Sequence, residues 1–206
     1  MNSFPELIKF DPGMYIEALV HWLILNFQGF FDALTDVIKW IVFNIQDGLS
    51  FIPWFLFILL IFLLGWKLKS FKSGLGYAMM IMLIGLIGLW EDMIFTLAIV
   101  ITSVILSIII GIPIGIFSAY NQKLEALLKP LLDGMQTMPS FVYLIPAMIF
   151  FGLGTVPAVF ATIVYSTPPC IRLTSLAIQR VPKEMREAAY AFGSSRWQAL
   201  VKVELP

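Results

Sequence analysis

The chain has 206 residues, of which 60% are hydrophobic and only 13% charged, against about 25% charged in soluble domains. The net charge of zero leaves no basic surface that would neutralise nucleic-acid phosphates. Cys170 and His21 are each the only residue of their type, which excludes an internal disulfide and Cys- or His-rich metal sites. No Gly-x4-Gly-Lys-Ser/Thr stretch is present, so a Walker-type nucleotide site is also excluded.

Residues 1–47 are predicted to form an extracytoplasmic amphipathic segment. Apolar residues from Ile16 to Ile45 recur at steps of three and four, and Trp22 and Trp40 suit the headgroup region. We expect one or two helices on the membrane surface, serving as a plain anchor or as a regulatory or partner-docking element. The opposite face carries polar and ionisable residues, namely Glu17, His21, Gln28, Asp32, Asp36 and Lys39.

Charge-free blocks then predict five membrane-spanning helices, because a span needs about 20 apolar residues. The first two form an accessory pair within residues 48–90, and the other three belong to residues 91–206. The expected spans are 48–66, 73–90, 93–122, 131–151 and 156–176.

The charges between these blocks predict the orientation. Lys67, Lys69 and Lys72 follow the first span and place that loop in the cytoplasm. Alternation then places Glu91 and Asp92 outside, together with the N-terminus, and places the arginine-rich segment after the fifth span inside.

That last segment carries an informative spacing of small, acidic and glycine residues. Pro182 is suited to begin a helix, and the region from Val181 to Trp197 is expected to form one or two short cytoplasmic helices. Gly193 is expected at or beside a bend. An ordinary amphipathic helix is the alternative interpretation. The spacing is Glu187-Ala188-Ala189, three residues, Gly193, nine residues, then Val203-Glu204-Leu205-Pro206.

This spacing resembles the E-A-A–x3–G–x9–I–x–L-P signature of permease subunits of bacterial ABC importers, with Val203 in place of isoleucine. The resemblance implies that this segment couples the chain to a separate ATPase. The coupling residues would be Glu187, Ala188, Ala189, Gly193, Leu205 and Pro206.

From about Asp133 to Pro206 the chain is similar to permeases of the glycine betaine/proline betaine type, above all in the stretch Met135–Pro146. The resemblance implies an all-α, polytopic type I ABC importer permease fold. It also implies two permease copies, two ATPase subunits and an external binding protein. The chain would then be no enzyme and hold no cofactor, since ATP and Mg²⁺ belong to the ATPase. The family fold continues with about two more membrane helices, so we expect a fragment or truncated product without those C-terminal helices.

A polar cluster within the fourth predicted span is the candidate lining of a translocation path. Prolines disrupt helices, and in lipid the freed backbone groups need neighbours or water. Aromatic faces attract a quaternary ammonium. Kinked helices that pack through small and polar residues are the equal alternative. The cluster consists of Gln136, Thr137, Pro139, Ser140, Phe141 and Tyr143.

Four further features have simpler interpretations. Gly111 and Gly115 have the spacing of close helix packing. Arg172 is expected to extend to the cytoplasmic interface, with pairing to a gate residue as the alternative. Asp133 is expected to cap the N-terminus of the fourth span. Pro168-Pro169 predicts a second kink.

Two classes of function remain at this point. A transport permease explains the E-A-A spacing, whereas a membrane enzyme would need an acid–base pair that the apolar blocks lack. A non-transporting scaffold would not need the spacing. The substrate is a further alternative, because importers of amino acids, sulfonates and methionine share the coupling motif.

Overall fold

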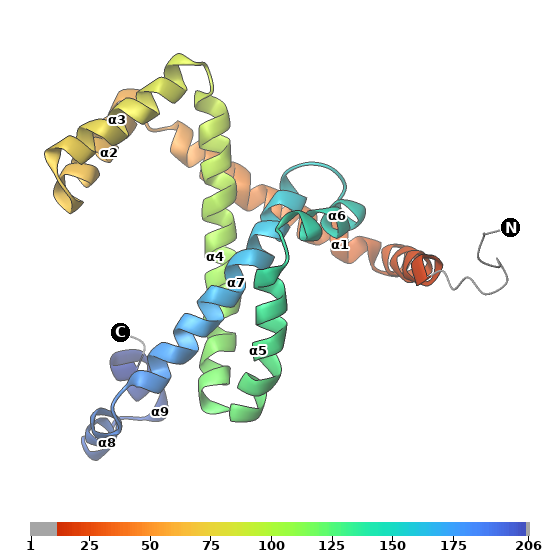
Figure 1. The fold of residues 1–206 in the computed structure, drawn as a ribbon, viewed down its shortest axis with the longest axis vertical. Helices are drawn as coiled ribbons and strands as arrows, with labels where there is room; N and C mark the ends of the chain where they lie inside the picture. The colour runs from red at the N-terminus through yellow and green to blue at the C-terminus, as the bar shows by residue number, and fades with distance from the viewer. Residues whose placement is uncertain (1–11, 205–206) are drawn as a thin grey trace, which may run out of the picture.

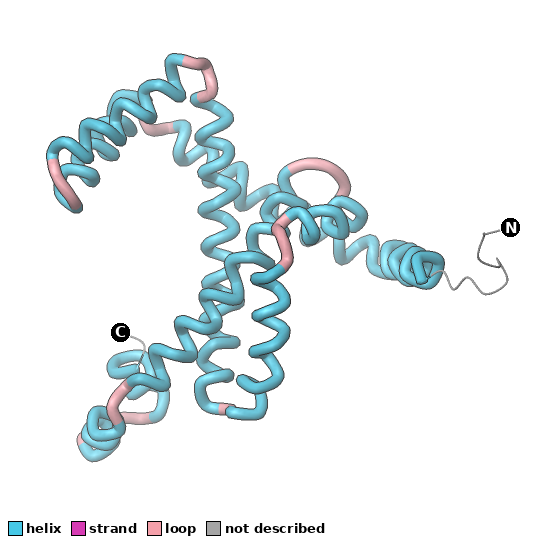
Figure 2. The backbone as a smooth tube through the Cα atoms, in the orientation of Figure 1, coloured by secondary structure: helices cyan, strands magenta, loops and turns pink. Residues whose placement is uncertain are grey.

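The structure is a computed structural model that describes residues 12–204, and this part of the chain consists of helices joined by short turns (Figures 1 and 2). The predicted all-α fold class is confirmed. The elements are α1 Pro12–Ser50, α2 Trp54–Leu68, α3 Phe71–Leu86, α4 Trp90–Tyr120, α5 Gln122–Thr137, α6 Phe141–Phe151, α7 Thr155–Arg180, α8 Lys183–Ala191, α9 Arg196–Ala199 and the π-helical turn η2 Leu200–Glu204.

The N-terminal segment is one long helix, α1, with a kink at Phe27. Its second half enters the core, where Ile38 and Val42 are buried against α4 and α7. Most of its first half is exposed, as expected for the amphipathic pattern. The helix therefore differs from a purely surface-lying segment because its apolar stripe has a protein partner near the C-terminal end. Residues 1–11 of the predicted segment lie outside the described part.

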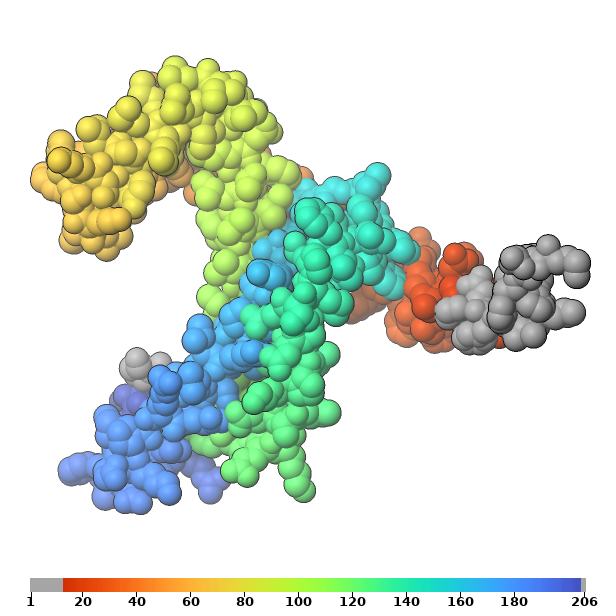
Figure 3. All heavy atoms as spheres, in the orientation of Figure 1, coloured from red at the N-terminus to blue at the C-terminus, as the bar shows by residue number. Residues whose placement is uncertain are grey.

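Helices α2 and α3 form a hairpin that extends away from the rest of the molecule (Figures 1 and 3). Gly65 and Gly74 allow the two backbones to meet, since a Cβ on Gly74 would lie 2.5 Å from a backbone oxygen of α2. The Ser70 side chain caps the start of α3. With 15 and 16 residues, each helix is about 22–24 Å long, shorter than a hydrocarbon core of about 30 Å.

Helices α4 and α7 pack along each other and form the centre of the fold. A Cβ on Gly111 would lie 2.7 Å from the Cys170 sulfur, and one on Gly115 would lie 2.8 Å from a backbone oxygen of α7. The hydroxyls of Ser107 and Ser166 are 2.5 Å apart across the same interface. The geometry confirms the predicted close packing at the Gly-x3-Gly spacing.

The fourth predicted span is not one helix, and this is a correction. Helix α5 ends at Thr137, α6 begins at Phe141, and the pair is bent by 95°. Pro139 explains the break, because it has no N–H to donate and holds the preceding Met138 in an extended conformation (φ −79°, ψ 135°).

The same helix corrects the expectation for Asp133, which lies inside α5. The N-cap is Asn121, whose side chain accepts hydrogen bonds from the backbone of Lys123 and Leu124. Prolines elsewhere do not break their helices: Pro146 is inside α6, and Pro168 and Pro169 are inside the continuous α7.

Among the described residues, α4 alone is long and apolar enough to cross a membrane unaided. Up to three spans result if the bent pairs α1–α2 and α5–α6 each count as one. This count is lower than the five predicted because α2 and α3 are short and the 131–151 block is broken.

Candidate functional site

The E-A-A residues lie on α8, a nine-residue helix that follows Pro182. Glu187 and Ala188 are exposed and Ala189 is half-buried, so the helix presents most of the motif at its surface. Helix α8 buries no side chain completely. Two short helices, α8 and α9, form where one or two were predicted, and the turn at Gly193 between them means that residues 181–197 are not one continuous helix.

Gly193 ends α8 in a left-handed conformation, with φ +81°. The amide of Gly193 donates to the Tyr190 carbonyl at 2.9 Å, and the amide of Ser194 donates to the Ala189 carbonyl at 3.0 Å. This pair of bonds is the Schellman pattern, in which glycine provides the positive φ without steric cost. A Cβ at Gly193 would meet nothing within 4 Å, so the glycine is needed here for its φ angle and not for close approach.

After this turn the chain folds back onto itself through α9 and η2. Ser195 and Gln198 form a capping box at the start of α9. Ala199 and Leu200 are buried, whereas Trp197 is 69% exposed. We call residues 183–204 the E-A-A segment. Leu205 and Pro206, the last two predicted coupling residues, lie outside the described part.

The E-A-A segment lies at the end of the bundle where α4 ends, α5 begins and α7 ends (Figure 1). A hollow of about 700 Å³ is lined here by Tyr120 of α4 and by side chains of the segment. Tyr120 donates a hydrogen bond to the Glu204 carboxylate, which is 3% exposed. Sequence reasoning missed both residues. The sequence feature that could have indicated a buried carboxylate is the position of Glu204 next to the apolar residues Leu200, Val201 and Val203.

The predicted path residues gather at the break between α5 and α6. Thr137 donates to the Gly134 carbonyl at 3.1 Å, and the Tyr143 hydroxyl donates to the Met135 carbonyl at 2.9 Å, which bridges the break. Phe141 is 74% exposed. Tyr143 is half-buried, and the other members of the cluster, Gln136, Thr137, Pro139 and Ser140, are exposed.

The break lies about half-way along α4 rather than at an end of the bundle (Figure 1). Non-helical backbone at membrane depth is tolerated where it is covered by protein or lines a water-filled cavity. The arrangement therefore has the form of a discontinuous helix with polar side chains at its interruption, which is a recurrent construction of substrate sites in transporters.

Polar side chains tie α5 to α7 below the break. Arg172 forms an ion pair with Asp133, and the Gln179 amide donates to a Glu125 oxygen at 2.9 Å. Arg172, Gln179 and Glu125 line a pocket of about 240 Å³ between α4, α5 and α7, and Asp133 does not. Arg172 thus has a carboxylate partner on the facing helix, while its extension to the cytoplasmic interface stays a prediction.

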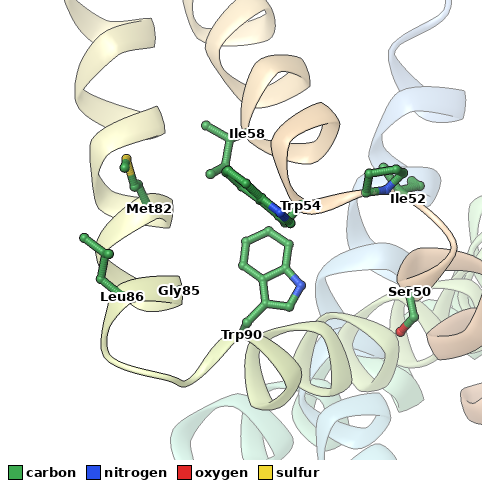
Figure 4. A pocket seen from close by; sticks show the side chains of 9 residues that line it. Ser50, Ile52, Trp54, Ile58, Met82, Gly85, Leu86 and Trp90 are labelled. Atoms are coloured by element: carbon green, nitrogen blue, oxygen red, sulfur yellow. The ribbon is translucent and has the colours of Figure 1, made fainter.

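A second hollow, not predicted from the sequence, lies at the opposite end of α4. It has a volume of about 510 Å³ and is mostly apolar, with Trp54 of α2 and Trp90 of α4 close together on its wall (Figure 4). Phe57 packs edge-to-face on Trp90, with ring centroids 5.6 Å apart.

Within residues 12–204 no group of three or more acidic, His or Cys side chains is arranged to hold a metal ion.

Comparison with known proteins agrees with this geometry. Residues 111–206 match the family described as "Binding-protein-dependent transport system inner membrane component". The whole chain is 42% identical over 206 residues to the glycine betaine transport system permease protein OpuAB of Bacillus subtilis (strain 168), of which it covers 72%. The chain belongs to the binding-protein-dependent transport inner-membrane family. It is thus an all-α, polytopic membrane subunit of an ABC transport system and not itself an enzyme.

Two further relatives of this transport subunit span nearly all of its length. The glycine betaine/carnitine transport permease protein GbuB of Listeria monocytogenes serotype 1/2a (strain 10403S) is 44% identical over an alignment 206 residues long, which covers 98% of this chain and 73% of the relative. The glycine betaine/proline betaine transport system permease protein ProW of Escherichia coli (strain K12) is 37% identical over 187 residues, 91% of this chain and 53% of the relative.

Proposed function

We propose that this subunit is the permease of an ATP-driven importer of osmoprotectants, with glycine betaine, proline betaine or a related quaternary amine as substrate. The observation that carries the proposal is similarity along the whole chain to permeases named for glycine betaine transport. Carnitine is a second candidate, because one of these relatives is named for both compounds. Permeases of amino-acid or sulfonate importers and a non-transporting scaffold are the remaining alternatives.

The break between α5 and α6 is the proposed translocation path. Its support is the gathering of polar and aromatic side chains where the helix is interrupted. A quaternary ammonium makes no hydrogen bonds and is attracted to aromatic faces, for which Phe141 and Tyr143 are placed. The Gln136 amide and the Ser140 hydroxyl can donate to the carboxylate of a betaine, whereas the Thr137 hydroxyl donates to Gly134 in this structure.

The E-A-A segment is the proposed contact with a separate ATPase, which holds ATP and Mg²⁺. Helix α8 supports this role because it is exposed and anchored by Pro182 at one end and the Gly193 turn at the other. The importer would contain two copies of the permease and an external binding protein. In this arrangement the N-terminus lies outside and the E-A-A segment lies in the cytoplasm.

Uptake into proteoliposomes tests the substrate. The permease, its ATPase and its binding protein are reconstituted, and labelled glycine betaine, proline betaine, carnitine and a sulfonate are offered at equal concentration. We expect ATP-dependent uptake of the quaternary amines and none of the sulfonate. Uptake of the sulfonate alone would contradict the proposed substrate class, and absence of uptake with every compound would favour a scaffold.

The role of Glu187 provides a separate prediction about the ATPase contact. Glu187→Gln is expected to weaken ATPase binding by about 2–5 kcal/mol if a buried cationic partner is left unpaired, and by less at a rim. Glu184→Gln on the same helix is the matched control, because Glu184 lies in the first turn and acts on the helix end. Binding measured by surface plasmon resonance decides: equal losses in both variants would argue against a specific role of Glu187.

A further inference from the structure

The E-A-A segment is held by a single side-chain hydrogen bond to an earlier helix, as far as the described residues show. Its elements α8, α9 and η2 pack mainly on one another. Tyr120, the last residue of α4, donates to the Glu204 carboxylate in η2, which lies 84 positions later. Beside this bond lies the hollow of about 700 Å³, so side-chain packing between α4 and the segment is incomplete there.

The Glu204 carboxylate is an unusual group to bury. It is 3% exposed, and its second oxygen, Oε1, has no hydrogen-bond partner in the described part of the chain. Burying a carboxylate is costly unless it is hydrogen-bonded, and bonds to a charged acceptor are stronger than neutral ones. The bond from Tyr120 is thus the main compensation for this burial, and its loss leaves a buried charge unsatisfied.

Within residues 12–204 the segment has two attachments to the bundle. One is covalent, through Val181 and Pro182 at the end of α7. The other is the Tyr120–Glu204 bond to the end of α4. The bond to α4 adds to the covalent link with α7, so a displacement of the segment acts on both helices. Those two helices are already in close contact at Gly111 and Gly115.

We propose that Tyr120 and Glu204 are positioning residues that tie the E-A-A segment to α4, so that movement of the segment by the ATPase reaches α4 as well as α7. The proposal rests on the proposed function, because it assigns the segment to the ATPase contact. Packed side chains and hydrogen bonds between two elements carry energetic coupling from one to the other. The tie supplies the connection to α4 that the packing of the segment does not.

Distance measurements test the tie without any substrate. Nitroxide labels are placed on Phe117 of α4 and Val201 of η2, both exposed, in a Cys170→Ala background of the full complex in nanodiscs. We expect a narrow distance distribution that broadens in Tyr120→Phe. Tyr165→Phe, the same change at an exposed tyrosine of α7, is the control and should leave the distribution narrow.

Transport stoichiometry tests the consequence. Tyr120→Phe is expected to lower the population of the tied arrangement about tenfold, as the loss of one hydrogen bond to a charged group implies, and to lower uptake per ATP hydrolysed in the same direction. Adding Glu204→Met removes the unsatisfied charge and should restore thermal stability but not the stoichiometry. If Glu204→Met restored both thermal stability and stoichiometry, Tyr120 and Glu204 would have only a structural role, and the proposal would be overturned.

The outcomes separate this proposal from the proposed function. If the wild-type complex takes up no quaternary amine, the substrate assignment fails, while the distance distributions and ATPase stimulation still decide on the tie. If Tyr120→Phe leaves the distance distribution narrow, the tie is absent. If the distribution broadens but coupling is unchanged, movement does not pass through it, and the proposal is equally wrong.

Discussion

Gly193 shows at the scale of one residue how backbone conformation shapes the proposed ATPase contact. Its φ of +81° closes the Schellman turn, and space around it is open. A left-handed conformation costs a residue with a Cβ about 1–2 kcal/mol, and a β-branched residue suffers most. Any effect of substitution here therefore comes from the backbone and not from a clash with a neighbour.

Gly193→Val is accordingly expected to unseat α8 and to lower ATPase stimulation by loaded binding protein about tenfold. Gly193→Asn is the matched control, because asparagine tolerates positive φ better than other residues. Substrate capture by the binding protein should be unchanged in both variants. Normal stimulation in a correctly assembled Gly193→Val complex would show that this turn is not part of the coupling device.

At the scale of elements, the contact between α4 and α7 depends on the absence of side chains at two positions. Gly111→Ala is expected to destabilise the protein by about 1–3 kcal/mol, because the added Cβ would lie 2.7–2.8 Å from Cys170. Gly134→Ala in α5 is the control: it has nothing within 4 Å and gains helix propensity. Thermal unfolding in detergent compares them, and equal melting temperatures would contradict the close packing.

The link between α5 and α7 is expected to be weaker. The Asp133 and Arg172 side chains are 52% and 38% exposed, so solvent screens the pair and each single substitution should cost at most about 1 kcal/mol. The charge exchange Asp133→Arg with Arg172→Asp should recover most of that loss. A double-mutant cycle on unfolding in detergent measures the coupling, and a value of zero would show that the pair contributes nothing to stability.

For the whole molecule, the orientation in the membrane decides whether the E-A-A segment faces the cytoplasm, as the proposed ATPase contact requires. The structure places Lys69 at the turn of the α2–α3 hairpin and Asp92 in the first turn of α4. The predicted topology requires the short helices α2 and α3 each to cross the membrane. In a Cys170→Ala background we then expect a cysteine at position 69 to react only after permeabilisation. A cysteine at position 92 should react with an impermeant maleimide in intact cells. Labelling of position 69 from outside would invert the predicted topology.

Local chemistry decided much of this molecule, and the sequence was sufficient to predict it. The apolar blocks indicate a helical membrane protein, and their polar boundaries lie close to the ends of α4 and α7. The segment from Val181 to Trp197 was predicted to form one or two short helices with Gly193 at or beside a bend, because proline and glycine restrict or free the backbone wherever they occur. The spacing of Gly111 and Gly115 predicted close packing for the same reason.

Features that join distant parts of the chain were decided only by the tertiary structure. Pro139 predicted a disrupted helix, but the sequence did not predict the 95° bend between α5 and α6. The pairing of Arg172 with Asp133 and of Tyr120 with Glu204 joins residues 39 and 84 positions apart. The burial of Ile38 and Val42 likewise needs α4 and α7 as partners. A residue's own chemistry sets its local conformation. Its distant partner depends on how the helices cross, and a local sequence pattern does not determine that crossing.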